Sequence, residues 1–126
     1  MEIINAPAAP AAVGPYSHAV RLGSLLFCSG QVPLSPEDGK LVGETVEPQT
    51  HQVFANIKAV LASQGLSLDN VVKTTVFLQS MSDFPAMNAI YSEHFGSHKP
   101  ARSTVEVAKL PLGALVEIEC IAAFEG

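Results

Sequence analysis

The chain has 126 residues, enough for one domain that buries a substantial core without a disulfide or a structural metal. Hydrophobic residues make up 48% of the sequence and charged residues 15%, which excludes intrinsic disorder. Twelve acidic residues outnumber 7 lysines and arginines, and the resulting net charge of −5 argues against a nucleic-acid-binding protein. We therefore expect a single domain spanning residues 1–126.

The expected cellular context follows from the N-terminal residues and the two cysteines. Residues 1–17 have neither the basic region nor the leucine-rich segment of a signal peptide. No apolar run approaches the ~18 residues that a membrane helix needs. Cys28 and Cys120 lie in apolar stretches, so we interpret them as reduced, buried thiols, with a disulfide between them as the less favoured alternative. We expect a cytoplasmic protein.

The first 45 residues predict an extended segment, a hairpin and a loop. The residues before Gly14 are rich in alanine and proline, which favours an extended conformation. Two apolar stretches flank Gly23 within residues 18–30, a pattern typical of a β-hairpin. The proline, aspartate and glycine content of residues 33–43 predicts a loop.

An amphipathic helix is predicted from Pro48 to Gly65, because the apolar residues there recur with a period near 3.6. Proline suits the first turn of a helix and glycine suits its end. The residues of the inward stripe are Val53, Phe54, Ile57, Val60 and Leu61.

The second half predicts a strand, a helix and two more strands. Residues 71–78 are β-branched and aromatic, which favours a buried strand. Ser82 or Asp83 can cap the next helix, which ends before Gly96. Its inward stripe consists of Phe84, Met87, Tyr91 and Phe95, with Asn88 beside them. Residues 102–107 and 115–124 predict two final strands. The order β-β-α-β-α-β-β indicates an α/β (α+β) sheet with two helices on one face.

Alternation along the two final strands separates apolar from polar residues. Val116, Ile118, Cys120, Ala122 and Phe124 share one face of the last strand. The opposite face carries Glu117 and Glu119, whereas Arg102, Thr104 and Glu106 share one face of the strand before. Because two helices cover one sheet face, we expect the apolar face to be covered. The uncovered face then carries both the arginine and the carboxylates.

Three polar residues are candidates for ligand binding or proton transfer, each with an ordinary structural alternative. The guanidinium of Arg102 could hold a carboxylate through two parallel hydrogen bonds, but spacing alone favours an arginine that is solvated or paired with Glu106 or Glu117. Partial burial of Glu117 would raise its pKa and suit it to proton transfer, although a surface carboxylate is favoured when this residue is taken alone. For Asn88, ligand contact and a capping or interface role are equally open.

Other motifs carry less weight. His94 and His98 have the spacing of a metal pair, but Gly96 interrupts the helix between them and no third ligand is evident, so we expect no metal site. Nothing near Cys28 in the sequence would lower its pKa, so a buried thiol is favoured over a nucleophile. No dinucleotide-binding, phosphate-binding or serine-hydrolase motif is present in the sequence.

Five segments, in chain order and without a sizeable insertion, resemble the YjgF/RidA family of reactive-intermediate imine deaminases. They are GPYSHAV (14–20), FCSGQVPL (27–34), VVKTTVFL (71–78), MNAIY (87–91) and PARSTVEVAKLPLGALVEIECIA (100–122). The last segment is highly specific, whereas GPYS and SGQ alone would be weak. The resemblance implies a homotrimer with a chorismate-mutase-like fold and ligand clefts between subunits. It also implies a hydrolase that converts 2-iminobutanoate and 2-iminopropanoate to 2-keto acids and ammonia without a cofactor.

The resemblance also implies roles for individual residues. Arg102 corresponds to the carboxylate-binding arginine and Glu117 to the glutamate that contacts the water. The remaining ligand-contacting positions correspond to Tyr16, Ser29, Gly30, Asn88 and Thr104, the last through its backbone groups. A cysteine is common in the family at position 104 and a glutamine at position 18, where this chain has Thr104 and His18.

Two other functions stay open at this point. One is a non-catalytic trimeric module that senses 2-keto or imino acids, but Arg102 and Glu117 are both present and favour an enzyme. The other is RNA cleavage, which is also attributed to members of this family. The acidic composition and the absence of a basic aromatic stripe from the sequence argue against RNA as the substrate.

Overall fold

The protein contains one six-stranded sheet with the strand order β1-β2-β3-β6-β4-β5. Buried residues alternate with less buried ones along its central strands β4 and β6, as expected for strands with one covered face. The computed structural model describes residues 1–124. Its strands are β1 (Glu2–Ile4), β2 (Ala19–Leu22), β3 (Leu25–Gln31), β4 (Val71–Leu78), β5 (Ala101–Glu106) and β6 (Val116–Ala123). Neighbouring strands are antiparallel except β4 and β5, which run parallel. The predicted hairpin and the strand over residues 71–78 are confirmed.

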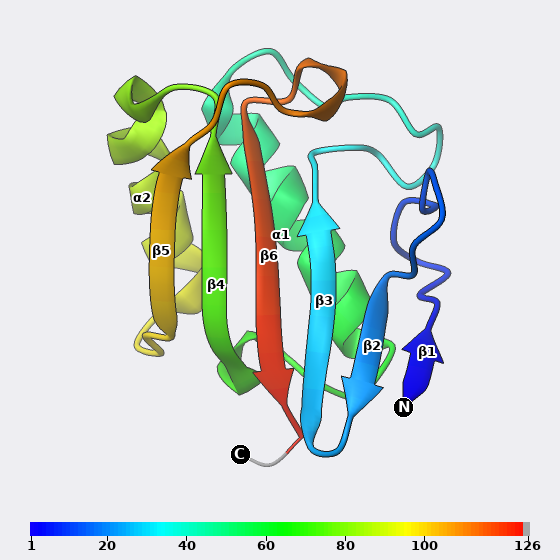
Figure 1. Ribbon diagram of the computed structural model, residues 1–126. Coiled ribbons are helices and arrows are strands. Elements are labelled where there is room, and N and C mark those ends of the chain that lie inside the picture. The colour runs from blue at the N-terminus through cyan, green and yellow to red at the C-terminus, as the bar shows by residue number, and fades with distance from the viewer. Residues whose placement is uncertain (125–126) are drawn as a thin grey trace.

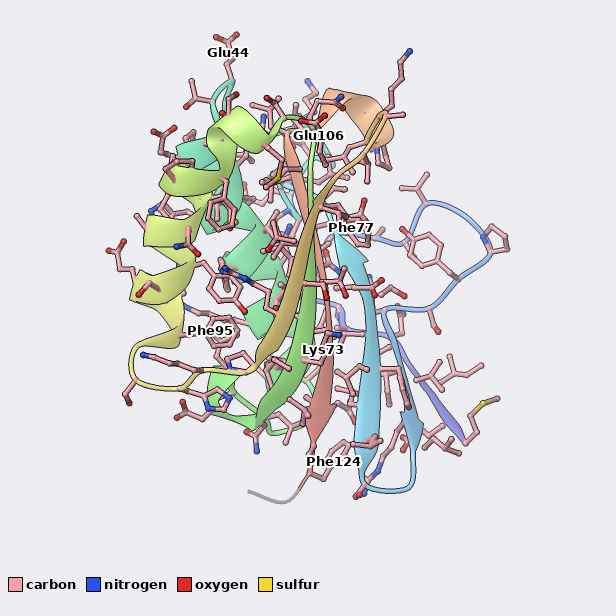
Figure 2. The ribbon with its side chains drawn as sticks, turned by 60° about the vertical axis from the view of Figure 1, so that its left-hand side comes forward. Glu44, Lys73, Phe77, Phe95, Glu106 and Phe124 are labelled. Atoms are coloured by element: carbon pink, nitrogen blue, oxygen red, sulfur yellow. The ribbon has the colours of Figure 1, made fainter. Side chains whose placement is uncertain are left out.

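Both helices, α1 (Val46–Ala62) and α2 (Phe84–Phe95), lie on the same side of the sheet (Figure 1). In the rotated view of Figure 2, Phe95 lies on the helix side, whereas Phe77 lies on the opposite, uncovered face. Three short 3₁₀ turns complete the structure: η1 (Leu68–Asn70), η2 (Met81–Asp83) and η3 (Pro111–Gly113). No helix in the described part of the chain is both long and apolar enough to cross a membrane. The α+β architecture with two helices on one face is as predicted.

The core lies between the helices and the covered face of the sheet. All five residues of the predicted α1 stripe are buried. Phe54 of this stripe packs edge-on against Tyr91 and Phe95 of α2, with a ring-centroid distance of 5.7 Å in each case. The Tyr91 hydroxyl reaches Thr74 Oγ1 of β4 at 2.7 Å, so its polar end is satisfied inside the core. Each large apolar side chain buried in this way stabilises the fold by about 1.5–3 kcal/mol.

The structure adds one strand to the predicted order. β1 pairs with β2 through the registers Glu2↔Arg21 and Ile4↔Ala19. Its three residues are too few to show a period of two in the sequence. β1 pairs with the edge of β2 that would otherwise be unpaired, and this edge exists only once the sheet has formed.

The expectation that Arg102 and Glu117 share the uncovered face is wrong. Thr74 of β4 pairs with Arg102 on one side and with Cys120 on the other, which places Arg102 on the helix-covered face. Phe77 of β4 pairs with Glu117, on the uncovered face. At the edge of the sheet, a long arginine can lie beneath a helix and still reach water with its charged end.

A histidine at the helix–helix contact makes stability sensitive to pH. The ring of His94 stacks on Phe54 at 4.5 Å, its Nδ1 accepts a hydrogen bond from Lys58 at 3.0 Å, and its Nε2 lies 2.9 Å from Nδ1 of His51. Burial, the charge of Lys58 and then the neighbouring His51 lower the pKa of His94, against a smaller opposing effect of Glu93.

Because the pKa of His94 is lowered in the folded protein, the unfolded chain takes up this proton first. The free energy of unfolding therefore falls as the pH drops through about 6.5. We expect Tm to decrease more between about pH 7.5 and about pH 5.5 in the wild type than in His94→Gln, measured by differential scanning calorimetry. Parallel Tm curves for the two proteins would contradict this role of His94.

Candidate active site

A cavity of about 450 Å³ opens beside the end of β3 and the start of β6. Residues of the N-terminal segment, the loop after β3 and η3 border it, and these segments gather at the same end of the sheet (Figure 1). Four of the predicted site residues line this cavity: Tyr16, Ser29, Gly30 and Glu117. These residues are far apart in the sequence, and the pairing of β3 with β6 brings Ser29 and Gly30 close to Glu117.

Glu117 packs directly on the backbone of Gly30. A Cβ atom at position 30 would collide with the carboxylate of Glu117 and lie 3.0 Å from its Cδ. The register of β3 against β6 shifts between Cys28 and Gln31, so Gly30 lies within an irregular part of the ladder. Burial, and secondarily the charge of Glu119, raises the pKa of Glu117. A carboxylate with a raised pKa in a cavity is suited to accept and return a proton.

Ser29 and Tyr16 occupy different parts of the same cavity. The Ser29 hydroxyl donates to the carbonyl oxygen of Ser17 at 2.7 Å, and its backbone N–H donates to that of His18 at 3.0 Å. Ser29 therefore fastens the N-terminal segment to β3. Tyr16 is 52% exposed, so its ring lies at the rim of the cavity.

His18 holds the cavity wall in place, a role that sequence reasoning missed. The side chain is 3% exposed, and its Nδ1 accepts a hydrogen bond from the backbone N–H of Ala6 at 2.8 Å. Nε2 must then carry the hydrogen and donates it to the carbonyl oxygen of Pro10 at 2.7 Å. Both ring nitrogens thus bind the extended segment that borders the cavity.

Two buried amides of α1, also missed, hold other parts of the wall. Asn56 Nδ2 donates to the carbonyl oxygens of Val32 and Leu34, at 3.1 and 2.9 Å. Gln49 accepts a hydrogen bond from the backbone N–H of Leu115 at 2.8 Å, two residues before Glu117. Both lie on the inward face of α1 at helical spacing from Val53, and a polar residue in an apolar stripe is the signal that could have found them.

Arg102 and Asn88 line a second cavity, of about 430 Å³, beside α2. Nη1 of Arg102 donates to Oδ1 of Asn88 at 2.7 Å, and the guanidinium lies 4.6 Å from the ring centroid of Tyr91. The alternative of an ion pair with Glu106 or Glu117 is not formed. Glu106 accepts a hydrogen bond from the backbone N–H of Met81, and Glu117 belongs to the other face. A neutral amide as partner leaves the positive charge of Arg102 available to an anion.

Thr104 lines neither cavity, and of the two histidines only His98 lines the cavity of Arg102. Thr104 pairs with Val76, and its Oγ1 is buried without a hydrogen-bond partner among residues 1–124. His98 binds the carbonyl oxygen of Val71 through Nε2 at 2.7 Å. The structure therefore does not bring His94 and His98 together, since His94 faces α1 instead.

Six of the seven predicted site residues thus form two groups, one at each cavity, and Thr104 belongs to neither. Arg102 and Asn88 lie on the helix side, and Glu117 and Gly30 lie at the cavity next to the N-terminal segment. A sheet with its covering helices separates the two groups. Within one chain, Arg102 and Glu117 therefore cannot contact the same small ligand.

Comparison with known proteins shows relatives that cover nearly the whole chain. A RutC family protein of Pyrococcus horikoshii is 49% identical over 96% of this chain and 96% of its own. Reactive Intermediate Deaminase A of Arabidopsis thaliana, a chloroplast protein, is also 49% identical, over 96% of this chain and 65% of its own. A 2-iminobutanoate/2-iminopropanoate deaminase of Dermatophagoides farinae is 42% identical over 98% of this chain and 96% of its own.

Solved structures show the same architecture. RidA from an Antarctic Psychrobacter species has a TM-score of 0.93 at 43% identity and covers 98% of this chain and 99% of its own. Escherichia coli TdcF with bound serine has a TM-score of 0.92 at 40% identity and covers 98% of each chain. The family model named Endoribonuclease L-PSP matches residues 6–124. With this match and relatives at such identity, the chain belongs to the Endoribonuclease L-PSP family, which is the YjgF/RidA family.

Proposed function

We propose that this protein hydrolyses small 2-imino acids, such as 2-iminobutanoate and 2-iminopropanoate, to 2-keto acids and ammonia. The observation that carries the proposal is the state of Arg102, a partly buried guanidinium held by a neutral amide at the wall of a cavity. Because no anionic side chain within residues 1–124 neutralises it, this guanidinium can bind a carboxylate. Two relatives with deaminase names, at 49% and 42% identity, support this reaction class.

Arg102 and Asn88 would hold the substrate. The carboxylate accepts two parallel hydrogen bonds from the guanidinium, while Asn88 keeps the guanidinium plane oriented through its 2.7 Å hydrogen bond. The ring of Tyr91 beneath the guanidinium favours the cation in this position. The serine bound to TdcF carries the same carboxylate group, which supports this ligand class.

Glu117 would handle the protons of the reaction. A protonated imine is an electrophile, so water adds to its carbon once the water is positioned. Glu117 accepts a proton from that water and returns it to the nitrogen. As the C–N bond breaks, Glu117 takes the proton of the new hydroxyl group, the carbonyl of the 2-keto acid forms, and the departing ammonia carries that proton away as ammonium. Burial raises the pKa of Glu117, which makes its carboxylate a better proton acceptor than an exposed one.

A site with both residues requires two copies of the chain. Arg102 and Glu117 lie on opposite faces, so one copy supplies the arginine and a neighbour supplies the glutamate. The uncovered face also carries apolar side chains such as Phe27 and Val105, which are 40% and 43% exposed. Burying such surface gains roughly 25 cal/mol per Å². The family resemblance supplies the number of subunits, and we propose a homotrimer with clefts between subunits.

The reaction itself can be tested with a trapping assay. A threonine dehydratase generates 2-iminobutanoate, and semicarbazide captures whatever imine survives. Adding the protein at submicromolar concentration should lower semicarbazone formation and accelerate the release of 2-ketobutanoate. Unchanged trapping across several imino acids, together with binding of 2-keto acids, would leave a non-catalytic binding module instead.

Replacing Arg102 should remove carboxylate binding. Each charge-assisted hydrogen bond contributes about 1.5–3 kcal/mol, so Arg102→Ala should lower kcat/KM by a factor on the order of 10² or more. Arg102→Lys should be nearly as inactive, because an ammonium cannot form the two parallel bonds. The matched control is Arg21→Lys in β2. Arg21 lies against Phe124 and lines neither cavity, so this change should leave activity unchanged. Normal activity in folded Arg102→Ala would remove this residue from the mechanism.

Replacing Glu117 should lower the turnover rate without lowering the stability of the protein. Glu117→Gln should lower kcat much more than it changes affinity for a 2-keto acid. A raised pKa in the folded protein means that the charged carboxylate is destabilising above that pKa, so Glu117→Gln should keep or raise Tm at neutral pH. Glu119→Gln, on the same face but exposed, is the control with near-normal turnover.

Gly30→Ala tests the same group from the opposite side, because the added methyl must displace the Glu117 carboxylate. Its kcat should fall as in Glu117→Gln. A Gly30→Ala protein with normal kcat would show that the position of this carboxylate is unimportant.

The shared site makes a prediction about assembly. Light scattering at micromolar concentration should give about three times 13.2 kDa. If each site takes Arg102 from one copy and Glu117 from another, co-expressing inactive Arg102→Ala and Glu117→Gln chains in equal amounts should restore about a quarter of wild-type activity. With random mixing, a quarter of the interfaces pair the intact Arg102 of one variant with the intact Glu117 of the other. No restored activity in mixed assemblies would show that Arg102 and Glu117 do not act together in a site shared between copies.

A further inference from the structure

The two cysteines of the chain lie directly opposite each other on neighbouring strands. Cys28 of β3 and Cys120 of β6 are register partners in the antiparallel ladder, and both are free thiols. They project to the same face, since side chains of paired residues in a sheet point the same way. The proposed hydrolysis uses neither of them.

The backbone geometry of this pair is compatible with a disulfide. The N–H of Ser29 donates to the carbonyl oxygen of His18, just before β2. At the end of the β3–β6 pair, the N–H of Phe124, just after β6, donates to the carbonyl oxygen of Ser24, just before β3. With this alternation, the backbone groups of Cys28 point to β6, so Cys28 and Cys120 form a hydrogen-bonded pair with a Cα separation of about 5.5 Å. Disulfides span Cα separations of about 4.4–6.8 Å.

Closing the bond requires a small local movement. Cβ atoms of directly opposed residues are about 4.5–5.5 Å apart, whereas a disulfide needs about 3.5–4.5 Å, so they must approach by about 1 Å. The register shift between Cys28 and Gln31 gives β3 an irregular segment immediately after the first cysteine. Such irregularities allow a strand to bend and twist locally.

The two thiols are chemically unequal. Cys28 is partly exposed, whereas Cys120 is 3% exposed. The neighbouring Cys120 thiol lowers the pKa of Cys28 against an opposing effect of burial, whereas the neighbouring Cys28 thiol and burial both raise the pKa of Cys120. Accessible thiolates react with oxidants, and a neighbouring second thiol resolves the product. Cys28 therefore has the character of the attacking sulfur and Cys120 that of the resolving one.

We propose that Cys28 and Cys120 are a peroxide-responsive thiol pair that closes reversibly to a disulfide. The Cys28 thiolate attacks one oxygen of the peroxide, the O–O bond breaks, and a sulfenic acid and one water form. The Cys120 thiol then attacks this sulfur and expels the second water as the S–S bond forms. Two electrons pass from the thiols to the peroxide, and a reducing thiol restores the pair.

The bond would join the two strands that carry Gly30 and Glu117. Cys28 precedes Ser29 and Gly30 by one and two residues, and Cys120 follows Glu117 by three. A covalent link here would constrain the strand pair next to the first cavity.

The test treats the full-length protein with hydrogen peroxide and follows both thiols, which are the only two in the chain. Free thiols measured after denaturation should fall from two to none, and the intact mass should fall by about 2 Da. Tryptic peptides 22–40 and 110–126 should be found joined, and dithiothreitol should separate them. In a mixture of ¹⁵N-labelled and unlabelled protein, the joined peptides should carry the same label.

Single variants assign the order of attack. In Cys120→Ser, a 1,3-dione probe should trap sulfenic acid at Cys28, whereas Cys28→Ser should show at least tenfold less labelling at Cys120. Cys120→Ala repeats the measurement should the serine variant fold poorly. Two outcomes overturn the proposal: sulfinic acid without joined peptides, or joined peptides that link different chains.

Discussion

The antiparallel pairing of β3 with β6 joins the N-terminal hairpin to the C-terminal strand, and most other features depend on its register. The same pairing sets Glu117 against Gly30 and Cys28 against Cys120. A slip of one residue would exchange the two faces of β6 and move its buried side chains into solvent. The burial of Val116, Ile118 and Ala122 beneath the helices therefore enforces the position of Glu117 as well.

The one-sided coverage of the sheet is the second constraint. The two helices bury one face, and the other keeps apolar and acidic residues side by side. Arg102 follows the covered face because β5 takes its alternation from its parallel neighbour β4. A single chain consequently holds Arg102 and Glu117 at two separate cavities, and the proposed reaction needs both residues. This division is what makes assembly part of the proposed function rather than an addition to it.

Buried polar side chains shape the cavity between these elements. His18, Gln49 and Asn56 use their polar atoms to hold backbone segments that have no regular partners of their own. Unpaired, such groups would cost about 1–3 kcal/mol each, so their bonds specify the loops as strongly as apolar packing specifies the core. The Oγ1 of Thr104 is an exception within the described residues, since it is buried and unpaired.

The sequence by itself determined the helices, the central strands and the residues that they bury, because these follow from local periodicity and from proline and glycine at helix ends. Resemblance to a family, rather than spacing, identified Arg102 and Glu117 as a set. Only the tertiary structure decided that they lie on opposite faces, because the face of an edge strand depends on which neighbour it pairs with. β1, the wall-holding role of His18 and the contact between Cys28 and Cys120 likewise depend on long-range pairing, which no local pattern of residues encodes.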